Sequence, residues 1–450
     1  MAETIILKNR NLLIKEFSEE HEKDGQKKWI TTKVSIERSA GVIENFTKDE
    51  SGFAQKEGEE KLLEPKISLK DLASQEKVRF YKQLLQSKYN EIEHLVILSG
   101  AGSSVGIGKM VKGYTMAGLW DAMSEGAEKE HLETLIKETK FAPIDKEGKI
   151  ITDKLSKDLE SLLSKAGMKQ IVDGNKKLEE SIKAAREFIV TKCSLDLPDD
   201  APHAHFLNKV ILRPQKFPRV KIFTLNYDTL FEQAAAKEKF TVLDGFTFSS
   251  PRAFNGRYFD YDIIETKHNR QDKKDSTISK LFYLFKMHGS LNWGKKGNEI
   301  EQIDGKIEVN DRVMIFPQDS KYEHSYEQPY FEMMARFQQA MRTENTLLIT
   351  IGFSFLDKHI SSVILESLKQ NSSLNLISLT YPSVVGNEKE YQLELHKIAE
   401  LQSRITLIGE TFNSFTNEFP ENMAHKRFDL LEELNEQLKT IKSGNGVDAK

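Results

Sequence analysis

The spacing of hydrophobic and polar residues is irregular in the first part of the chain and regular in the rest. Residues 1–70 are polar and irregular, and within them only 4–7 and 29–36 carry strand-like patterns. Apolar residues then recur at helical spacing over 69–90, and the continuous apolar run 94–99 follows. Because a run of this length bounded by glycines is typical of a strand buried on both faces, the pattern indicates a parallel sheet from this point on.

A regular alternation of strands and helices follows a helix-rich stretch over 115–200. The pattern predicts strands over 220–225, 282–287, 313–316, 346–351, 374–379 and 405–408, and helices over 228–238, 330–341, 357–370, 388–401 and 427–441. Strands that alternate with helices build βαβ units and hence parallel sheets. The expected fold class is therefore α/β, with a Rossmann-like, mostly parallel sheet, helices on both faces, a helical insertion and an N-terminal extension.

The same pattern divides the chain into consecutive parts. Residues 1–70 form an N-terminal extension that packs on the body or on a partner. The Rossmann-like domain comprises 71–114 and 201–420, and the helical insertion 115–200 interrupts it. Residues 421–450 add an amphipathic C-terminal helix and a tail.

Composition and charge narrow the function classes. The chain has 450 residues, of which 38% are hydrophobic and 30% are charged. Its net charge of −4 gives no excess of positive charge, so direct nucleic-acid binding is not indicated. The single cysteine, Cys193, excludes an intrachain disulfide and a cysteine-based zinc ribbon, so no metal is expected. The sequence contains neither a secretory signal nor an apolar run long enough to span a bilayer. We therefore expect a cytoplasmic protein without membrane contact.

A glycine-rich loop, 100–108, leaves the first buried strand. Glycines permit positive φ and let a phosphate approach the backbone, whose N–H groups can then hold a pyrophosphate. Two phosphate-binding templates do not fit, since the Walker pattern requires glycine where Ser103 stands and the dinucleotide fingerprint requires glycine at Val105. The loop is therefore either a nucleotide-binding loop or a tight turn without a ligand.

Polar residues follow a second strand. Thr224, Asn226 and Asp228 alternate with apolar residues near the carboxyl end of the strand 220–225, where ligands bind in open α/β sheets. Asp228 also suits the N-cap of the following helix, which is a purely structural explanation for that residue. Capping leaves Asn226 unexplained, because asparagine is a poor strand former.

Two further strand ends carry candidate residues. His288 ends an apolar strand and is a candidate general base, because imidazole titrates near neutral pH. A lone histidine is also often a hydrogen-bonded loop or core residue. Gly352 and Ser354 end a later strand, where they contact a ribose or phosphate or else form a strand-to-helix turn capped by Asp357.

Together these segments resemble the sirtuin family. The family signature is a Gly-Ala-Gly-x-Ser loop, a Thr-x-Asn-x-Asp segment, a His-Gly pair and a Gly-[Thr/Ser]-Ser turn, in that order. The corresponding segments here are 100–104, 224–228, 288–289 and 352–354. The resemblance covers roughly residues 90–410.

The resemblance implies a sirtuin-like Rossmann domain whose substrate is NAD. The resemblance also implies which residues surround the dinucleotide, from its pyrophosphate to its nicotinamide and adenosine sides. They are Gly100, Ala101, Gly102, Ser104, Thr224, Gly352 and Ser354. The residues implied to be catalytic are Asn226 and Asp228, which hold the nicotinamide ribose and the attacking water, and His288, which is the base.

The chain departs from the family mainly on the side that binds an acylated peptide. Family deacylases carry a four-cysteine zinc ribbon, which a single cysteine cannot build. They continue the glycine loop with an arginine and an aromatic residue that are missing from 106–111. They also pair a Phe-Gly-Glu strand with the peptide, where Pro317 here lacks a backbone donor. On the nucleotide side, Tyr381 stands near the place of a family asparagine.

This combination resembles the bacterial sirtuin-like NAD hydrolases of anti-phage defence. That resemblance implies hydrolysis of NAD to nicotinamide and ADP-ribose, which depletes infected cells of NAD. Family members of about this size are encoded with a HerA-type hexameric ATPase and are controlled by assembly. We therefore expect a homo-oligomer and a HerA-type ATPase partner.

Two other functions remain open. An NAD-dependent protein deacylase needs a peptide groove, against which the missing zinc ribbon and peptide strand argue. A non-catalytic sensor subunit binds NAD or ADP-ribose without turnover. The presence of both Asn226 and His288 argues against a sensor, because a pure binder requires neither.

Overall fold

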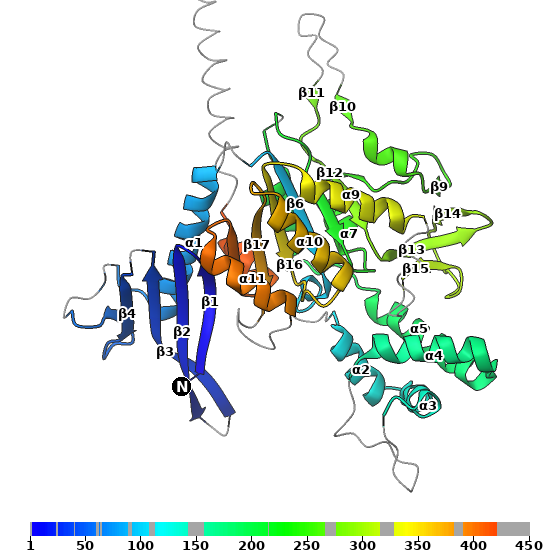
Figure 1. Cartoon of the computed structure of the whole chain (residues 1–450), viewed down its shortest axis with the longest axis horizontal. Helices are drawn as coiled ribbons and strands as arrows, with labels where there is room; N and C mark the ends of the chain where they lie inside the picture. Colours follow the sequence, from blue (N-terminus) through cyan, green and yellow to red (C-terminus); the bar gives the residue numbers. More distant parts are fainter. Residues whose placement is uncertain are drawn as a thin grey trace, which may run out of the picture.

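The computed structural model describes residues 2–23, 26–39, 41–59, 63, 65–88, 92–107, 113–142, 157–214, 216–265, 276–315, 328–381 and 390–420. Over these residues, a sheet of twelve strands runs through the molecule (Figure 1). The strand order is β5-β4-β3-β2-β1-β18-β17-β16-β6-β7-β12-β8.

One part of this sheet, from β18 to β8, is parallel throughout. Its strands are β18 (Ile405–Gly409), β17 (Asn375–Thr380), β16 (Thr346–Ile351), β6 (His94–Ser99), β7 (Lys221–Thr224), β12 (Leu281–Lys286) and β8 (Thr241–Leu243). All of them except β8 were predicted. Side chains of β16 are buried along its whole length, as expected for a strand covered on both faces. The predicted α/β fold with a mostly parallel sheet is confirmed.

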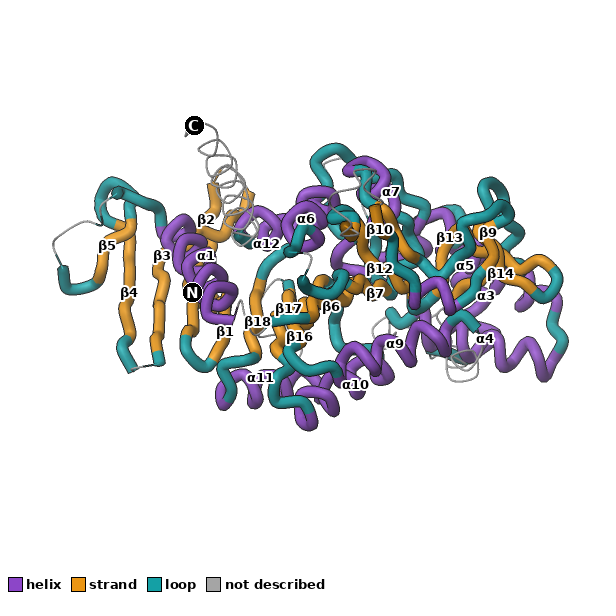
Figure 2. Tube along the Cα trace, turned by 90° about the horizontal axis from the view of Figure 1, so that it is seen from above, coloured by secondary structure: helices purple, strands orange, loops and turns teal. Residues whose placement is uncertain are grey.

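Helices cover both faces of the parallel strands (Figure 2). The helices on one face are α9 (Tyr330–Arg342), α10 (Lys358–Gln370) and α11 (Glu390–Leu401), and those on the other are α1 (Leu69–Lys88), α6 (Pro202–Ile211), α7 (Leu230–Glu238) and α12 (Phe412–Glu418). Val96 and Leu98 of β6 belong to the first core, and Ile97 belongs to the second. This division follows from the alternation of side chains along a strand. Sequence analysis did not predict α6 or α12.

The N-terminal region departs most from the predicted fold. Instead of an irregular extension with two strands, it forms an antiparallel meander of β1 (Ala2–Asn9), β2 (Leu12–Lys23), β3 (Gln26–Arg38), β4 (Ile43–Lys48) and β5 (Ala54–Lys56). β1 pairs antiparallel with β18, so the meander extends the sheet. Its apolar side chains, such as Ile14 and Val34, pack mainly against α1, while Ile5 of β1 packs against the core on the opposite face of the sheet. Polar residues such as Thr31 are also buried along these strands, and they interrupt the apolar–polar alternation by which a half-buried strand is predicted.

The helix-rich stretch predicted over 115–200 is mostly helical where the structure describes it, and its last helix ends at Cys193. It contains α2 (Met116–Glu125), α3 (Lys129–Thr139), α4 (Leu159–Asp173) and α5 (Lys176–Cys193). These helices have a core of their own, which also includes Tyr227 and Met314 near the carboxyl edge of the sheet. The boundaries of the predicted domains stay a prediction.

A small antiparallel sheet continues directly from β12. Its strands are β13 (Gly289–Lys296), β14 (Glu299–Gln302), β15 (Arg312–Met314) and β9 (Arg252–Ala253). The strand predicted over 313–316 thus belongs to this sheet and not to the parallel one, because β15 pairs antiparallel with β13. Two short strands, β10 (Ile264–Glu265) and β11 (Ser276–Thr277), pair separately.

Some expectations concern segments that the structure does not describe. The helix predicted over 427–441 lies outside the described residues. Within the described ranges, no helix combines the length and apolar character that a membrane crossing requires.

A buried ion-pair network joins α1 to the end of the parallel sheet. Lys77 Nζ lies 2.9 Å from Glu410 Oε2 and 2.7 Å from Glu418 Oε2. The Tyr81 hydroxyl donates to Glu410 Oε1 at 2.8 Å. Although burial opposes its charge, the two carboxylates together raise the pKa of Lys77. The network therefore depends on this one ammonium group.

We predict that Lys77→Ala lowers the free energy of unfolding by about 3–5 kcal/mol, because it leaves two carboxylates buried without their cation. Lys82→Ala, on the exposed side of the same helix, should change it by less than about 0.5 kcal/mol. Urea unfolding followed by circular dichroism measures both. Equal midpoints for the two variants would contradict the prediction.

One histidine of α6 lies in apolar surroundings. His203 is 1% exposed, and its ring centroid lies 5.1 Å from that of Phe231 and 5.2 Å from that of Phe412. Neither ring nitrogen has a hydrogen-bond partner among the described residues. Burial lowers the pKa of His203 from 6.5 to about 3.

Because this pKa is depressed, the stability that neutral His203 contributes is present above pH 6.5 and is lost as the pH falls toward about 3. At pH 4.5 the loss relative to pH 7 should be about 3 kcal/mol. His203→Leu should abolish this part of the pH dependence, whereas His205→Gln, at an exposed position, should keep it. Urea unfolding at both pH values measures the difference, and equal losses in the two variants would refute the assignment.

Candidate functional site

The four adjacent parallel strands β16, β6, β7 and β12 end at the same level of the sheet. The segments that carry the candidate residues follow directly after these strand ends. In the order β16-β6-β7-β12, Ile351 pairs with Ser99, Ser99 with Thr224, and Thr224 with Lys286. The alignment continues beyond the strands, where Met287 N donates to Thr224 O at 2.9 Å. The loops that carry the candidate residues therefore leave the sheet at one edge, where ligands bind in open α/β sheets.

The glycine loop packs directly on the loop that follows β16. A short 3-10 helix, η1 (Ala101–Ser103), begins just after β6, and Gly102 N donates to Gly352 O at 3.0 Å. A Cβ atom on Gly102 would lie 2.6 Å from Gly352 Cα, and one on Gly352 would lie 2.4 Å from Gly102 C. Gly352 also has a φ of +61°. Close packing of two loops therefore requires these glycines, whether or not a phosphate binds.

Most backbone N–H groups at the start of the loop are bonded within the protein. They belong to Gly100, Gly102, Ser103 and Ser104, whose acceptors are the carbonyl oxygens of Ile351, Gly352, Gly100 and Ala101. These four N–H groups already have acceptors within the protein, and contact of Gly100, Ala101 and Gly102 with a pyrophosphate stays a prediction. The loop N–H groups without an acceptor among the described residues are those of Ala101, Val105, Gly106 and Ile107. Gly108, at the end of the loop, lies outside the described residues.

Asn226, just beyond β7, is held by the glycine loop. Its Nδ2 donates to Gly100 O at 3.0 Å and to the hydroxyl oxygens of Ser103 at 3.0 Å and Ser104 at 2.9 Å. Its backbone N–H donates to Thr224 Oγ1 at 3.1 Å. Because a carbonyl oxygen can only accept, the contact with Gly100 fixes which end of the carboxamide is the nitrogen. Asn226 Oδ1 is left as an acceptor without a donor among the described residues.

The side chain of Asp228 is buried and accepts hydrogen bonds from two neighbouring residues. Its Oδ2 accepts a hydrogen bond from Ser104 Oγ at 2.7 Å, and its Oδ1 accepts one from Leu230 N at 3.2 Å. The second contact supports the first turn of α7, but the N-cap residue of this helix is Thr229, so Asp228 lies one position before the expected cap. A hydrogen-bonded chain runs from Asn226 through Ser104 to Asp228. Direct contact of Asp228, Ser104 or Thr224 with a ligand stays a prediction.

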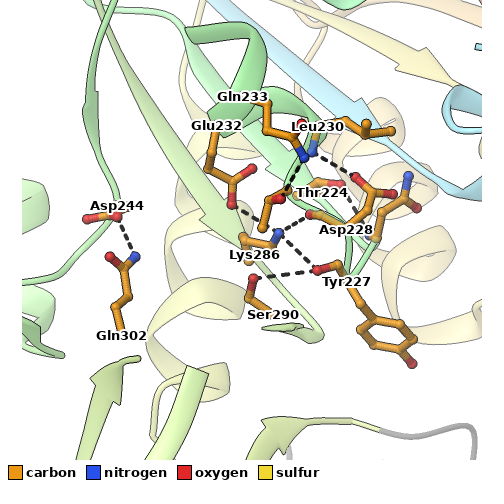
Figure 3. Close-up of polar contacts among 12 residues, drawn as sticks. Thr224, Tyr227, Asp228, Leu230, Glu232, Gln233, Asp244, Lys286, Ser290 and Gln302 are labelled. Atoms are coloured by element: carbon orange, nitrogen blue, oxygen red, sulfur yellow. Dashed lines mark hydrogen bonds and ion pairs between the residues drawn. The ribbon is translucent and has the colours of Figure 1, made fainter. Parts of the chain in front are cut away.

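Lys286, the last residue of β12, is a buried cation that sequence analysis did not identify. Its side chain is 2% exposed, and its Nζ donates to Tyr227 O at 3.3 Å, to Asp228 O, and to Glu232 Oε1 at 3.1 Å (Figure 3). Burial raises the pKa of Glu232, although the lysine opposes this shift. Lys286 thereby anchors the backbone that carries Asn226. The sequence did contain one sign of this buried cation, because a lysine interrupts the apolar run 281–287.

His288 faces a carboxylate that comes from another strand end. Its Nε2 lies 3.5 Å from Asp357 Oδ2, and the two side chains are 15% and 12% exposed. The next residue, Gly289, has a φ of +83°, and a Cβ atom there would lie 2.1 Å from Val313 O. Ile315 N donates to His288 O at 2.9 Å. The turn into β13 therefore requires glycine and fixes the histidine backbone.

The loop after β16 combines structural and exposed residues. Asp357 Oδ1 accepts from His359 N at 3.0 Å and from Ile360 N at 3.3 Å, so the expected cap of α10 is confirmed. Ser354 is exposed, and its predicted contact with the adenosine side stays a prediction. Tyr381, just after β17, is 73% exposed, whereas Pro317 lies outside the described residues.

Comparisons with known proteins agree with the geometry of this edge. Residues 220–401 match the model of the SIR2-like domain, while no curated protein matches the chain. The match runs from β7 to α11, so it contains Asn226, His288 and Gly352, whereas the glycine loop precedes it. SIR2-like domains are typical of NAD-dependent enzymes, which connects this part of the chain with NAD chemistry. Within the described ranges, no cluster of three or more metal-binding side chains occurs.

We predict that Gly352→Ala destabilises the protein more than Gly106→Ala does. Both glycines have a left-handed backbone, with φ of +61° and +67°, so both variants bear the cost of about 1–2 kcal/mol for alanine in that region. Only at Gly352 does the added Cβ atom meet another backbone, because nothing lies within 4 Å at Gly106. Urea unfolding should show a further loss of about 1–3 kcal/mol for Gly352→Ala. An equal loss for both variants would disprove the packing role.

Proposed function

We propose that this protein hydrolyses NAD to nicotinamide and ADP-ribose. The observation that carries the proposal is the alignment of four strand ends, followed by the glycine loop, Asn226, His288 and the Gly352 turn. The match of 220–401 to the SIR2-like domain supports NAD as the substrate. The single cysteine argues against the zinc ribbon of a peptide deacylase, and water then takes the place of the acylated lysine.

The reaction needs a water molecule on the ribose face opposite nicotinamide. The bond between the ribose anomeric carbon and the nicotinamide nitrogen breaks and its electrons leave with nicotinamide, while a water oxygen bonds to the same carbon. Asn226 Oδ1, which has no donor among the described residues, accepts a hydrogen bond from that water and orients it. His288 takes up the proton that the water loses, a role that contributes about 10²–10⁴-fold in known enzymes.

The surrounding residues bind and orient the dinucleotide. In our proposal, the N–H groups of Ala101, Val105 and Gly106 face the pyrophosphate, because they have no acceptor among the described residues. Ser354 faces the adenosine. Asp228, with Ser104, positions Asn226 and adds negative potential as positive charge develops on the ribose.

The biological setting of this activity belongs to the same proposal. We propose that the enzyme acts in the cytoplasm and depletes NAD in anti-phage defence. An unregulated NAD hydrolase would exhaust the cell that makes it. Control through homo-oligomerisation and a HerA-type ATPase would meet this requirement.

We predict that Asn226→Ala and His288→Ala each reduce nicotinamide release by at least about 100-fold, because each removes a group that acts on the water. Chromatography of NAD, nicotinamide and ADP-ribose measures the release. The matched controls are Asn208→Ala and His131→Ala, whose side chains contact Glu238 and Ser181 away from the site, and both should keep activity. Full activity in Asn226→Ala or His288→Ala would overturn the assignment.

A further inference from the structure

Asp357 has two carboxylate oxygens with different partners. Oδ1 accepts hydrogen bonds from His359 N and Ile360 N and so caps α10. Oδ2 lies 3.5 Å from His288 Nε2, and the site chemistry described above does not use it. Both side chains are largely buried, so solvent screens their interaction less than it would at the surface. The cap accounts for Oδ1, and His288 is a neighbour of Oδ2 among the described residues.

The contact spans the carboxyl edge of the sheet. His288 follows β12 and Asp357 follows β16, and two strands, β6 and β7, lie between them in the sheet. With strands about 4.8 Å apart, the loop after β16 has to reach across roughly 14 Å to meet the histidine. It does so with two left-handed residues, Gly352 at φ +61° and Phe355 at φ +57°. Phe355 is 1% exposed, so the core holds this unusual conformation.

We infer that Asp357 is a positioning residue for His288. A carboxylate that faces one imidazole nitrogen fixes the ring orientation and keeps the proton on that nitrogen. With Nε2 facing Asp357, Nδ1 is the nitrogen that takes up the proton, and the carboxylate stabilises the imidazolium that forms. The separation of 3.5 Å exceeds a hydrogen bond, and such contacts in unliganded enzymes often tighten when the substrate binds.

The neighbouring charged groups have other partners. Lys286, two residues before His288, donates to Tyr227 O, Asp228 O and Glu232. In the described part of the chain, Asp357 is the acidic side chain within ion-pair distance of His288. The role of Asp357 in turnover rests on the proposed function, but its effect on the ring does not.

The test exchanges Asp357 for residues that still cap a helix. Asn and Ser cap α10 about as well as Asp, but neither carries the charge that faces His288. The first readout is the pair of ring ¹⁵N chemical shifts of His288 in the full-length protein, which report the tautomer. We expect the Nε2–H tautomer in the unmodified protein and a mixture of tautomers in Asp357→Asn and Asp357→Ser. His288→Gln identifies the signals by their loss.

The second readout is nicotinamide release as a function of NAD concentration. We expect Asp357→Asn to lower kcat about tenfold to 100-fold with KM changed less than about threefold, because positioning assists proton uptake and not NAD binding. The control is Asp158→Asn, the same exchange at the N-cap of α4, where Asp158 accepts from Ser161 N at 3.1 Å. It should leave both readouts unchanged.

The outcomes separate this inference from the proposed function. An unchanged tautomer in both Asp357 variants would overturn it, whether or not NAD is hydrolysed. A tautomer shift in an enzyme without NAD hydrolysis would support the positioning of His288 while refuting the proposed function. An equal loss of kcat in Asp158→Asn would overturn the positioning role of Asp357 in turnover, since the exchange of a helix cap alone would then suffice.

Discussion

Hydrogen bonds between β16, β6, β7 and β12 bring Ile351, Ser99, Thr224 and Lys286 to one level across the sheet. Every candidate residue either ends one of these four strands, as Thr224 does, or occupies one of the first few positions after it. A shift of one residue in any pairing would turn alternate side chains to the opposite face of the sheet. The two apolar cores on either side prevent such a shift, because each takes every second side chain of the strands.

Polar groups beneath the site are satisfied within the protein before any ligand binds. Asn226 Nδ2 is held by the glycine loop, Ser104 connects it to Asp228, and Lys286 anchors the backbone behind both. A buried network of this kind holds side-chain geometry tightly when all its members have partners. The network fixes the orientation of Asn226 and therefore of its Oδ1 atom. Asp357 faces the His288 ring from the other side of the site. Fixed orientation of this kind is what the hydrolysis of a glycosidic bond needs.

Much of this architecture could be predicted from the sequence. Long apolar runs such as 94–99 and 346–351 identified the central strands, because a strand buried on both faces tolerates few polar residues. The N-terminal meander was missed because buried polar residues such as Thr31 interrupt the alternation of apolar and polar side chains along its strands. Lys286 and the contact between His288 and Asp357 were missed for another reason. They depend on which strands neighbour each other, and a single sequence does not give that order.

In the proposed reaction, water and not an acylated peptide accepts the ribosyl group of NAD. The most direct measurement is the yield of nicotinamide and ADP-ribose from NAD and the assembled protein without any peptide. We expect release of nicotinamide and ADP-ribose in equal amounts, unaffected by added acetylated peptide. Release that occurs only with the peptide, or no release in any assembly state, would contradict it.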